Sequence, residues 1–231
     1  MGRYSIAKRR KDVEREIAAK LRVEGVPEEG CERYNVAPTQ EVPAVVQNRD
    51  GRRVRMLRWG LVPRWAKRLD TGFTMINVRA ETLAASSAYG WLVERASHRC
   101  LVVADGFYEW IAPEDPRQPR RPLRFSLAGG ESFCFAGLWT TWTAPEGEPL
   151  ASCTVVTCAA NELVAPVHDR MPVVLAESPA WEAWLDPALD AAAVSELLAP
   201  PAPETLRVAP ANPALNSADF EGPDCLVAPA A

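Results

Sequence analysis

The sequence has 231 residues, of which 48% are hydrophobic and 24% are charged, and its formal net charge is −4. This length suits one large globular domain, or two small ones, with a substantial hydrophobic core. No apolar run approaches the roughly 20 residues that a membrane helix needs, and the charged start of the chain is unlike a signal peptide. We therefore expect a cytoplasmic protein with no membrane partner.

The charge is distributed unevenly along the chain. Residues 49–79 hold nine Arg or Lys and two acids, whereas residues 173–231 hold nine acids and a single base. Such asymmetry favours one basic face that a polyanion could use, although acids elsewhere in the fold could balance it. The six cysteines form no CxxC pair and have no histidine at metal-ligand spacing, so we expect neither a disulfide framework nor a metal site, and no cofactor.

The hydrophobic pattern predicts helices and strands in alternation. Val13, Ile17 and Leu21 fall four residues apart and predict an amphipathic helix over 8–22. Strands are predicted at 41–47 and 53–57, joined by an Asp-Gly turn, then a helix over 84–94 and a buried strand at 100–104. A proline-rich loop over 113–122 precedes strands at 123–127, 133–139 and 153–157. A short helix at 159–164, a strand at 172–175 and helices at 178–185 and 186–198 complete the pattern. Residues 200–231, rich in Pro and Ala, are expected to wrap the surface. This pattern predicts one α+β domain over 1–231.

Polar residues in three short runs stand out as candidates for proton transfer and orientation. Asn77, Arg79 and Glu81 alternate with apolar residues, so a strand would place them on one side. Glu109 lies between Tyr108 and Trp110 after the buried strand, where aromatic shielding suits proton transfer. His168 is one of only two histidines, and an acid, Asp169, and a base, Arg170, follow it directly. Histidine is the usual proton carrier near neutral pH. A structural role remains the alternative for each residue taken alone.

Other runs are typical of nucleic-acid contacts. Residues 34–40 (YNVAPTQ) place two amides and a hydroxyl around Pro38. Residues 59–65 (WGLVPRW) set Trp59 and Trp65 beside Arg58 and Arg64, a mixture that can stack bases and contact phosphates. Tryptophans of an ordinary core explain these aromatics about as well.

Taken together, the runs resemble the SOS response-associated peptidase (SRAP) family, the abasic-site processing proteins. The matching segments occur in family order: GRY at 2–4, YNVAPTQ at 34–40, WGLVPRWA at 59–66, INVRAET at 76–82, RCLVVADGFYEW at 99–110, FAGLW at 135–139, TVVTCAAN at 154–161 and VHDRMPVVL at 167–175. PALNS at 213–217 is similar to the family's closing segment. The resemblance implies a single SRAP-type domain in which mixed and antiparallel sheets form a barrel-like core with peripheral helices.

The resemblance also implies a function. Family members bind single-stranded DNA, or single-strand/double-strand junctions, at an abasic site, and an amino-terminal cysteine attacks the sugar aldehyde to form a thiazolidine crosslink. On this chain the resemblance implies that Asn77 orients the amino terminus, Glu109 handles the proton of the amine and His168 acts as acid/base on the sugar oxygen. It further implies phosphate contacts by residues that include Arg3, Arg79 and Arg170, and a base-unstacking wedge of Pro38, Trp65 and Trp110. We expect a monomer that associates with the nucleoid when bound to DNA.

The chain departs from the family at its start. The family begins Met-Cys-Gly-Arg, whereas this sequence reads Met1-Gly2-Arg3. Three explanations stay open: an altered or mis-recorded sequence, a member that binds abasic DNA without crosslinking, or catalysis by the α-amine alone, carried by Met1 or, after its removal, by Gly2. The amine alone would form a Schiff base and could support β-elimination. A cysteine-type self-processing peptidase is a third class of function to weigh.

Overall fold

The structure, a computed structural model, describes residues 1–23, 25–69, 75–144 and 147–229. Its core is a barrel of five strands: β3 (Glu41–Asn48), β4 (Gly51–Trp59), β6 (Arg99–Ala104), β9 (Phe133–Thr143) and β10 (Pro149–Ala159). β3 pairs antiparallel with β4 and β6, β6 with β9, and β9 with β10. A parallel pairing of β10 with β4 closes the circle, which removes exposed strand edges. The expected α+β fold with a barrel-like core is confirmed.

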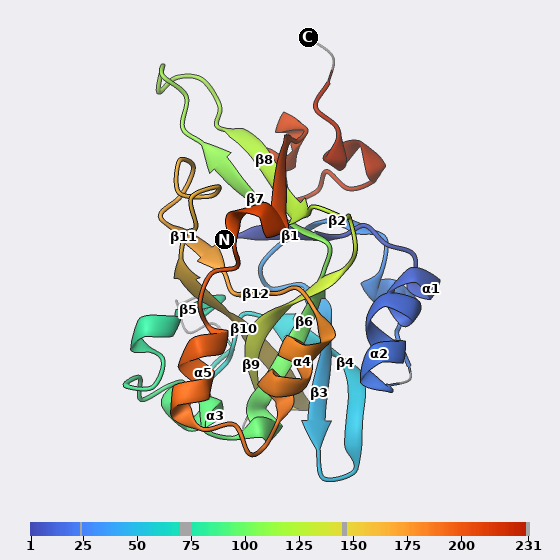
Figure 1. The fold of residues 1–231 in the computed structure, drawn as a ribbon, viewed down its shortest axis with the longest axis vertical. Coiled ribbons are helices and arrows are strands. Elements are labelled where there is room, and N and C mark those ends of the chain that lie inside the picture. Colours follow the sequence, from blue (N-terminus) through green and yellow to red (C-terminus); the bar gives the residue numbers. More distant parts are fainter. Residues whose placement is uncertain (24, 70–74, 145–146, 230–231) are drawn as a thin grey trace.

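Every residue of β6 is buried, because its outer face is covered as well as its inner face. Helix α4 (Ser178–Leu185) packs there, and the indole nitrogen of Trp184 donates to the Cys100 carbonyl at 3.0 Å. Helix α5 (Ala191–Leu197) follows beside it at the lower end of the molecule (Figure 1). Both faces of β6 are therefore buried, which explains the continuous run of hydrophobic residues in this strand.

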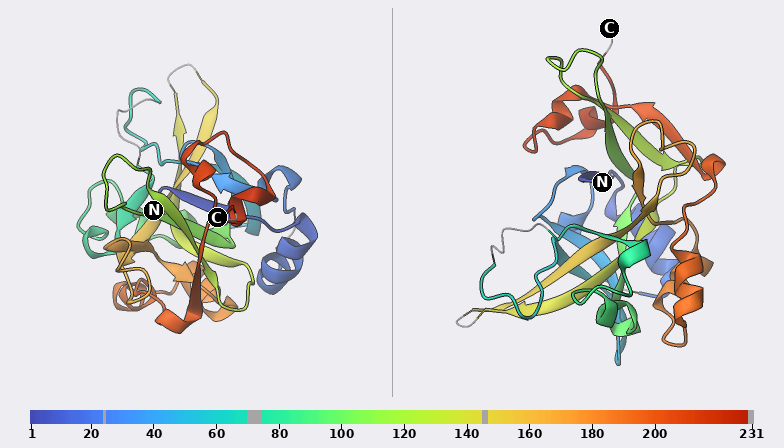
Figure 2. Two further views of the ribbon diagram at one scale, coloured as in Figure 1. Left: turned by 90° about the horizontal axis from the view of Figure 1, so that it is seen from above. Right: turned by 90° about the vertical axis from the view of Figure 1, so that its left-hand side faces the viewer.

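A second sheet of five antiparallel strands lies above the barrel (Figure 1). Its order is β13 (Leu206–Pro210), β8 (Arg121–Leu127), β7 (Gly106–Ile111), β1 (Arg3–Ile6) and β2 (Arg33–Val36). Because β1 lies between β2 and β7, the chain starts at the middle of this sheet, and the right-hand view of Figure 2 places the amino terminus between the sheet and the barrel. Three short strands complete the pairing: β5 (Asn77–Arg79), parallel to β10, β11 (Arg170–Pro172), antiparallel to β10, and β12 (Val174–Leu175), antiparallel to β9.

Helix α4 has the predicted bounds and the amino-terminal helical segment nearly so, whereas the other predicted helices are shorter or missing. Residues 10–21 form one helical segment in which α1 (Arg10–Val13) and α2 (Ala19–Leu21) flank a π-helical turn at Glu14–Ala18. The predicted helix over 84–94 is wrong except for α3 (Gly90–Val93), since residues 83–89 form turns. The predicted helix at 159–164 is also wrong, because β10 extends to Ala159 and the Asn161 side chain then accepts from the Val164 N–H, which stabilises a turn.

Two further predictions need correction. The strand expected at 172–175 is divided at Val173, whose N–H bonds β10 and whose carbonyl accepts from β9, so the chain crosses from one strand to the other. The loop expected over 113–122 ends two residues earlier, at Arg120, because Arg121 and Pro122 already pair with β7. The carboxy-terminal wrap does follow the surface, but it contributes β13 to the upper sheet.

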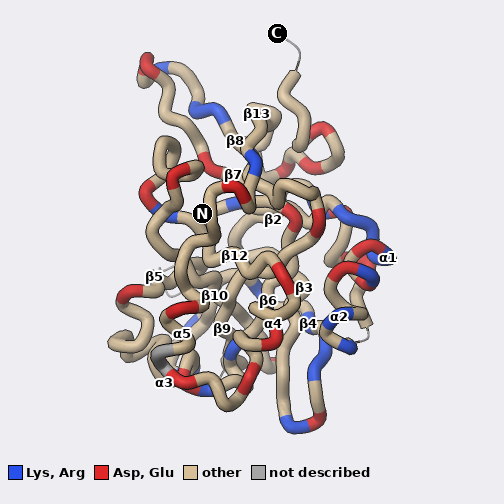
Figure 3. The backbone as a smooth tube through the Cα atoms, in the orientation of Figure 1, with Lys and Arg blue, Asp and Glu red and all other residues tan. Residues whose placement is uncertain are grey.

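The basic run over residues 49–79 is partly balanced by acids, and its Asp70 lies outside the described residues. Arg52 forms an ion pair with Glu182 of α4 at 2.6 Å. Figure 3 shows acidic residues interspersed among the basic ones along much of the chain. No helix in the described part of the chain has both the length and the apolar character to span a bilayer.

Candidate functional site

The amino terminus lies in an open cavity of about 460 Å³ between the upper sheet and the turn before β11. The residues that line it are Met1, Gly2, Arg3, Glu109, Trp110, Arg120, His168 and Asn216. Four of the five residues predicted to be catalytic, Met1, Gly2, Glu109 and His168, therefore meet in one place. The fifth, Asn77, reaches Met1 from β5.

Two side chains hold the backbone of Met1. The α-amine lies 2.9 Å from Oε1 of Glu109, and Nδ2 of Asn77 donates to the Met1 carbonyl at 2.6 Å. Met1 as a whole is 8% exposed, and its thioether packs within the hydrophobic core. Both contacts act on atoms of the main chain, so they position the amine regardless of the side chain that residue 1 carries.

Glu109 is held by its place in β7. Pairing of β1 with β7 sets Arg3 opposite Tyr108, so Glu109 is next along the strand toward the terminal residues. The carboxylate is buried, with 5% of the residue exposed. Oε1 accepts no hydrogen bond from the described residues apart from its ion pair with the amine, and Oδ1 of Asn77 is also buried without a partner. These two oxygens are the acceptors that the site offers close to the amine.

His168 lies in the turn before β11 with 42% of its side chain exposed. Its Nδ1 lies 2.9 Å from the backbone nitrogen of Arg170, and 3.1 Å from both the Arg170 carbonyl oxygen and an oxygen of Asp169. In the neutral ring Nδ1 can accept the Arg170 N–H, and in the protonated ring it can donate to one of these two oxygens. The protonated ring keeps its Nε2–H for a molecule in the cavity, and this is the form that a general acid requires.

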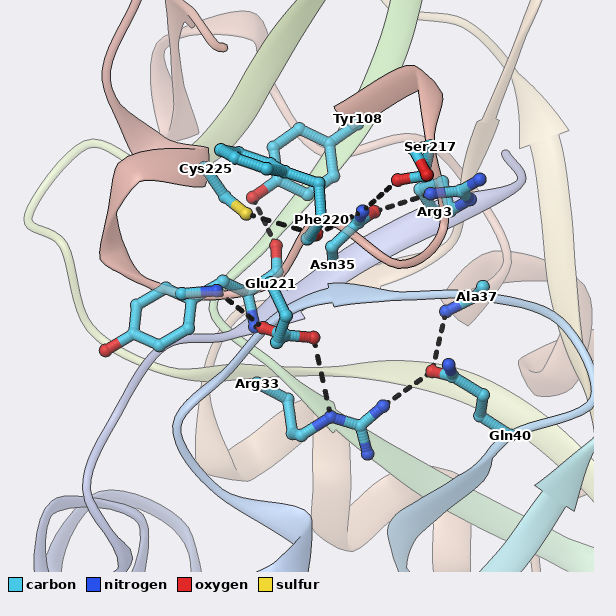
Figure 4. A network of polar contacts seen from close by, with 12 residues as sticks. Arg3, Arg33, Asn35, Ala37, Gln40, Tyr108, Ser217, Phe220, Glu221 and Cys225 are labelled. Atoms are coloured by element: carbon cyan, nitrogen blue, oxygen red, sulfur yellow. Dashed lines mark hydrogen bonds and ion pairs between the residues drawn. The ribbon is translucent and has the colours of Figure 1, made fainter. Parts of the chain in front are cut away.

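Arg3 is tied to the carboxy-terminal segment. Its guanidinium donates to Oδ1 of Asn35 at 2.7 Å and to the Leu215 carbonyl at 3.1 Å, and burial lowers its pKa. Figure 4 shows Asn35 bridging Arg3 to this segment, where its Nδ2 donates to the carbonyls of Ser217 and Phe220. The cation at the edge of the cavity is thus fixed by a network that spans most of the chain length.

The remaining predicted DNA contacts differ in their availability. Arg79 is exposed and makes no ion pair with its side chain in the described part of the protein. Arg170 instead donates two hydrogen bonds to Glu81, at 2.6 and 2.8 Å, and this pairing raises the pKa of Arg170 and lowers that of Glu81. Arg58 donates to the Gly60 carbonyl at 2.9 Å.

The three predicted wedge residues do not lie together in the cavity. Trp110 lines it, and its indole nitrogen donates to Oδ1 of Asn216 at 2.9 Å. Pro38 is half-buried in the turn after β2, and Trp65 is 71% exposed on the segment after β4. Neither lines the cavity at the amino terminus.

Sequence reasoning missed Arg120 and Asn216 as residues of the site. Asn216 lies in the PALNS segment, whose resemblance to the family was the available signal. Arg120 lies in the proline-rich loop, and no pattern in the sequence distinguishes it from the neighbouring arginines. Both reach the cavity because β8 and β13 pair in the upper sheet.

None of the six cysteines lines the cavity, and all six are buried. Burial raises the pKa of Cys31, Cys158 and Cys225 to about 11, so these thiols are protonated at neutral pH. The nucleophile that the cavity offers is therefore an amine. Among the described residues, no group of three or more His, Cys, Asp or Glu side chains is arranged to hold a metal ion.

The protein therefore has a closed barrel and a second sheet, and its cavity contains a main-chain amine that a carboxylate and an amide hold beside a histidine. Comparison with known families identifies the class. The model of the SOS response associated peptidase (SRAP) family matches residues 1–218, and the chain belongs to this family.

The relatives agree with this assignment. Abasic site processing protein YoqW of Bacillus subtilis is 44% identical over 154 residues, which cover 67% of this chain and 66% of YoqW. Abasic site processing protein HMCES of Gallus gallus is 33% identical over 222 residues, covering 84% of this chain and 65% of HMCES. The chain thus spans just under two thirds of the length of these relatives. A crystal structure of a protein from Bacteroides thetaiotaomicron shares the fold over 100% of both chains, with a TM-score of 0.85 at 21% identity.

Proposed function

We propose that this protein recognises abasic sites in single-stranded DNA and processes them through the α-amine at the start of β1. The observation that carries the proposal is the fixed position of residue 1. Its α-amine lies 2.9 Å from Oε1 of Glu109, and its carbonyl accepts a hydrogen bond from Nδ2 of Asn77 at 2.6 Å. The names of the relatives support the choice of an abasic site as substrate.

The chemistry follows from the three polar side chains. Protonated His168 donates from Nε2 to the sugar ring oxygen while the anomeric hydroxyl gives its proton to water, and the abasic sugar opens to its aldehyde. Glu109 accepts a proton from the amine, and the neutral nitrogen adds to the aldehyde carbon to give a carbinolamine. Return of a proton to the carbinolamine oxygen expels water and leaves an imine between the protein and the DNA.

The DNA contacts supply affinity and position. Arg3 at the rim of the cavity and exposed Arg79 on the same strand as Asn77 are placed to contact phosphates beside the lesion. An abasic nucleotide has no base to fill the cavity, so its sugar can approach the amine. The preference for a single strand or a junction, the wedge role of Pro38, Trp65 and Trp110, and the monomeric state belong to the same proposal.

The cavity contains no thiol to close on the imine, so the adduct stays a Schiff base and β-elimination of the 3′ phosphate can follow. The alternative is a module that binds abasic DNA without covalent chemistry. A cysteine-type peptidase is the weakest candidate, because every cysteine is buried away from the cavity.

The test is reductive trapping on an abasic single-stranded oligonucleotide. Intact mass first establishes whether residue 1 or residue 2 carries the amine. We expect a borohydride-dependent adduct whose peptide map places the DNA on the amino-terminal residue. Glu14→Gln, which breaks the exposed ion pair with Arg10 in the amino-terminal helical segment and lines no part of the cavity, is the matched control and should trap like the wild type. Binding without any reducible adduct would support the non-covalent module instead.

A further inference from the structure

The turn that carries His168 is shaped by Arg170. Nδ1 of His168 lies 2.9 Å from the backbone nitrogen of Arg170 and 3.1 Å from the Arg170 carbonyl oxygen. Because a large part of the His168 side chain is exposed, packing alone does not fix the ring. The direction of Nε2 therefore depends on where the main chain of Arg170 lies.

The side chain of Arg170 fixes that main chain. Its guanidinium donates to the two carboxylate oxygens of Glu81, at 2.6 and 2.8 Å, and to the Thr157 carbonyl at 2.7 Å. A bidentate pair of an arginine with a carboxylate is strong and well oriented, because two charge-assisted hydrogen bonds form at once. Arg170 is thus held by the protein at three acceptor atoms, whereas Arg79 on β5 is exposed.

Glu81 belongs to the segment that holds the reactive amine. It lies in a short 3₁₀ turn, Ala80–Thr82, which directly follows the strand of Asn77. Both β5 and β11 pair with β10, and both do so at Thr157. Since one residue pairs with neighbours on two sides, β5 and β11 lie on opposite edges of β10. The ion pair therefore crosses β10 and joins the strand of Asn77 to the turn of His168.

Stability is a poor explanation for this pair. Ion pairs with a half-exposed partner contribute little to folding, since solvent screens the charges and two side chains must be ordered. The carboxylate of Glu81 is half-exposed. The pair connects the two parts of the site, however, where a small shift of the histidine relative to the amine would slow the reaction.

We propose that Glu81 is a positioning residue that, through Arg170, sets the direction of the Nε2–H of His168 relative to the reactive amine. The inference rests on the proposed function, in which His168 donates to the ring oxygen of the abasic sugar. It adds a consequence for the individual steps. Opening of the sugar depends on Glu81, whereas addition of the amine to a free aldehyde does not.

Two substrates separate these steps. One is an abasic single-stranded oligonucleotide, and the other carries an abasic analogue that lacks the 4′ oxygen and cannot close to a ring. Single-turnover trapping with cyanoborohydride, which reduces imines faster than aldehydes, measures the rate of adduct formation on each. We expect Glu81→Gln to slow the reaction on the natural sugar about 10-fold, because a misplaced reacting group costs up to about 10²-fold. On the open aldehyde its rate should stay within about twofold of the wild type, because no ring oxygen needs a proton.

Glu182→Gln is the matched control. Glu182 pairs with Arg52 at 2.6 Å. The exposed fractions of these two side chains, 49% and 21%, are close to those of the pair at the site, 51% and 17%. The control pair joins β4 to α4 and lines no part of the cavity, so Glu182→Gln should react like the wild type on both substrates. A double variant adds a second readout: once His168 is replaced by alanine, Glu81→Gln should cause no further loss on the natural sugar.

Equal slowing of Glu81→Gln on both substrates would overturn the proposal, because a general structural role acts on every step alike. An unchanged rate on the natural sugar, or a further loss in the His168→Ala background, would overturn it as well. In each of these cases the wild type still forms adducts, so only the positioning role is refuted. A wild type that forms no adduct on either substrate would refute the proposed function and the inference with it.

Discussion

Removal of the Asn77 side chain is the sharpest test of how the amine is positioned. Asn77→Ala deletes the 2.6 Å hydrogen bond to the Met1 carbonyl and leaves the ion pair of the amine with Glu109 in place. Arg79→Ala is the matched comparison, since it lies two residues along on the same strand, is exposed and does not contact Met1.

The magnitude follows from the contact that is lost. A hydrogen bond of this kind contributes about 0.5–1.5 kcal/mol net, which changes the ratio of docked to undocked amino terminus about 2- to 13-fold. We therefore expect Asn77→Ala to slow imine formation about 3- to 10-fold at saturating DNA and to lower the free energy of unfolding by about 1 kcal/mol. Because Glu109 holds the same residue, the effects of Asn77→Ala and Glu109→Gln should not add in the double variant.

Single-turnover trapping with borohydride measures the rate, and denaturant unfolding measures the stability. Fluorescence anisotropy on the same oligonucleotide separates rate from affinity. If Asn77→Ala reacts at the wild-type rate while its DNA affinity falls, Asn77 contacts DNA and does not position the amine, and the reasoning is refuted.

Three further predictions concern the other groups at the cavity. His168→Ala should slow adduct formation about 10²-fold or more while the affinity for single-stranded DNA changes less than twofold; equal losses of both would indicate a structural histidine. Arg79→Ala should weaken binding and reduce the slope of log affinity against log salt by about 0.7, measured by anisotropy at several salt concentrations, and an unchanged slope would exclude a phosphate contact. Insertion of a cysteine between Met1 and Gly2 should, once the initiator Met is removed, convert the reducible adduct into one that survives without borohydride in a denaturing gel; a persistent need for borohydride would show that the thiol cannot reach the imine carbon.

The strands of the barrel could be predicted from the sequence, but their closure could not. Alternating or continuous apolar runs indicate β3, β4 and β6 directly, because each run records which faces are buried. Closure depends on the parallel pairing of Ser152 and Cys153 with Arg58 and Trp59, which are far apart in the chain. Hydrophobic periodicity reports burial and contains no information about the partner strand.

The same limit applies to the site. Glu109, Asn77 and His168 could be named because polar residues interrupt apolar strands there or because histidine is rare in this chain. Asn216 and Arg120 could not, since their positions depend on the pairing of β13 with β8 and on the course of loops between strands. The predicted helices were too long where apolar residues at helical spacing lie in turns, as at residues 84–89.

The departure of this chain from the family bears on one chemical step. Glu109 and Asn77 hold the amine and the carbonyl of residue 1, and neither contact involves its side chain. Replacement of a cysteine by Met1 therefore preserves the placement of the nucleophilic nitrogen, while the thioether, buried in the core, cannot attack an imine. In the proposed mechanism, ring opening and imine formation use groups that this chain retains, and only the closing of a thiazolidine needs the group that it lacks. On the proposed mechanism we therefore expect a reversible imine with the abasic aldehyde, which is lost either by hydrolysis or by β-elimination.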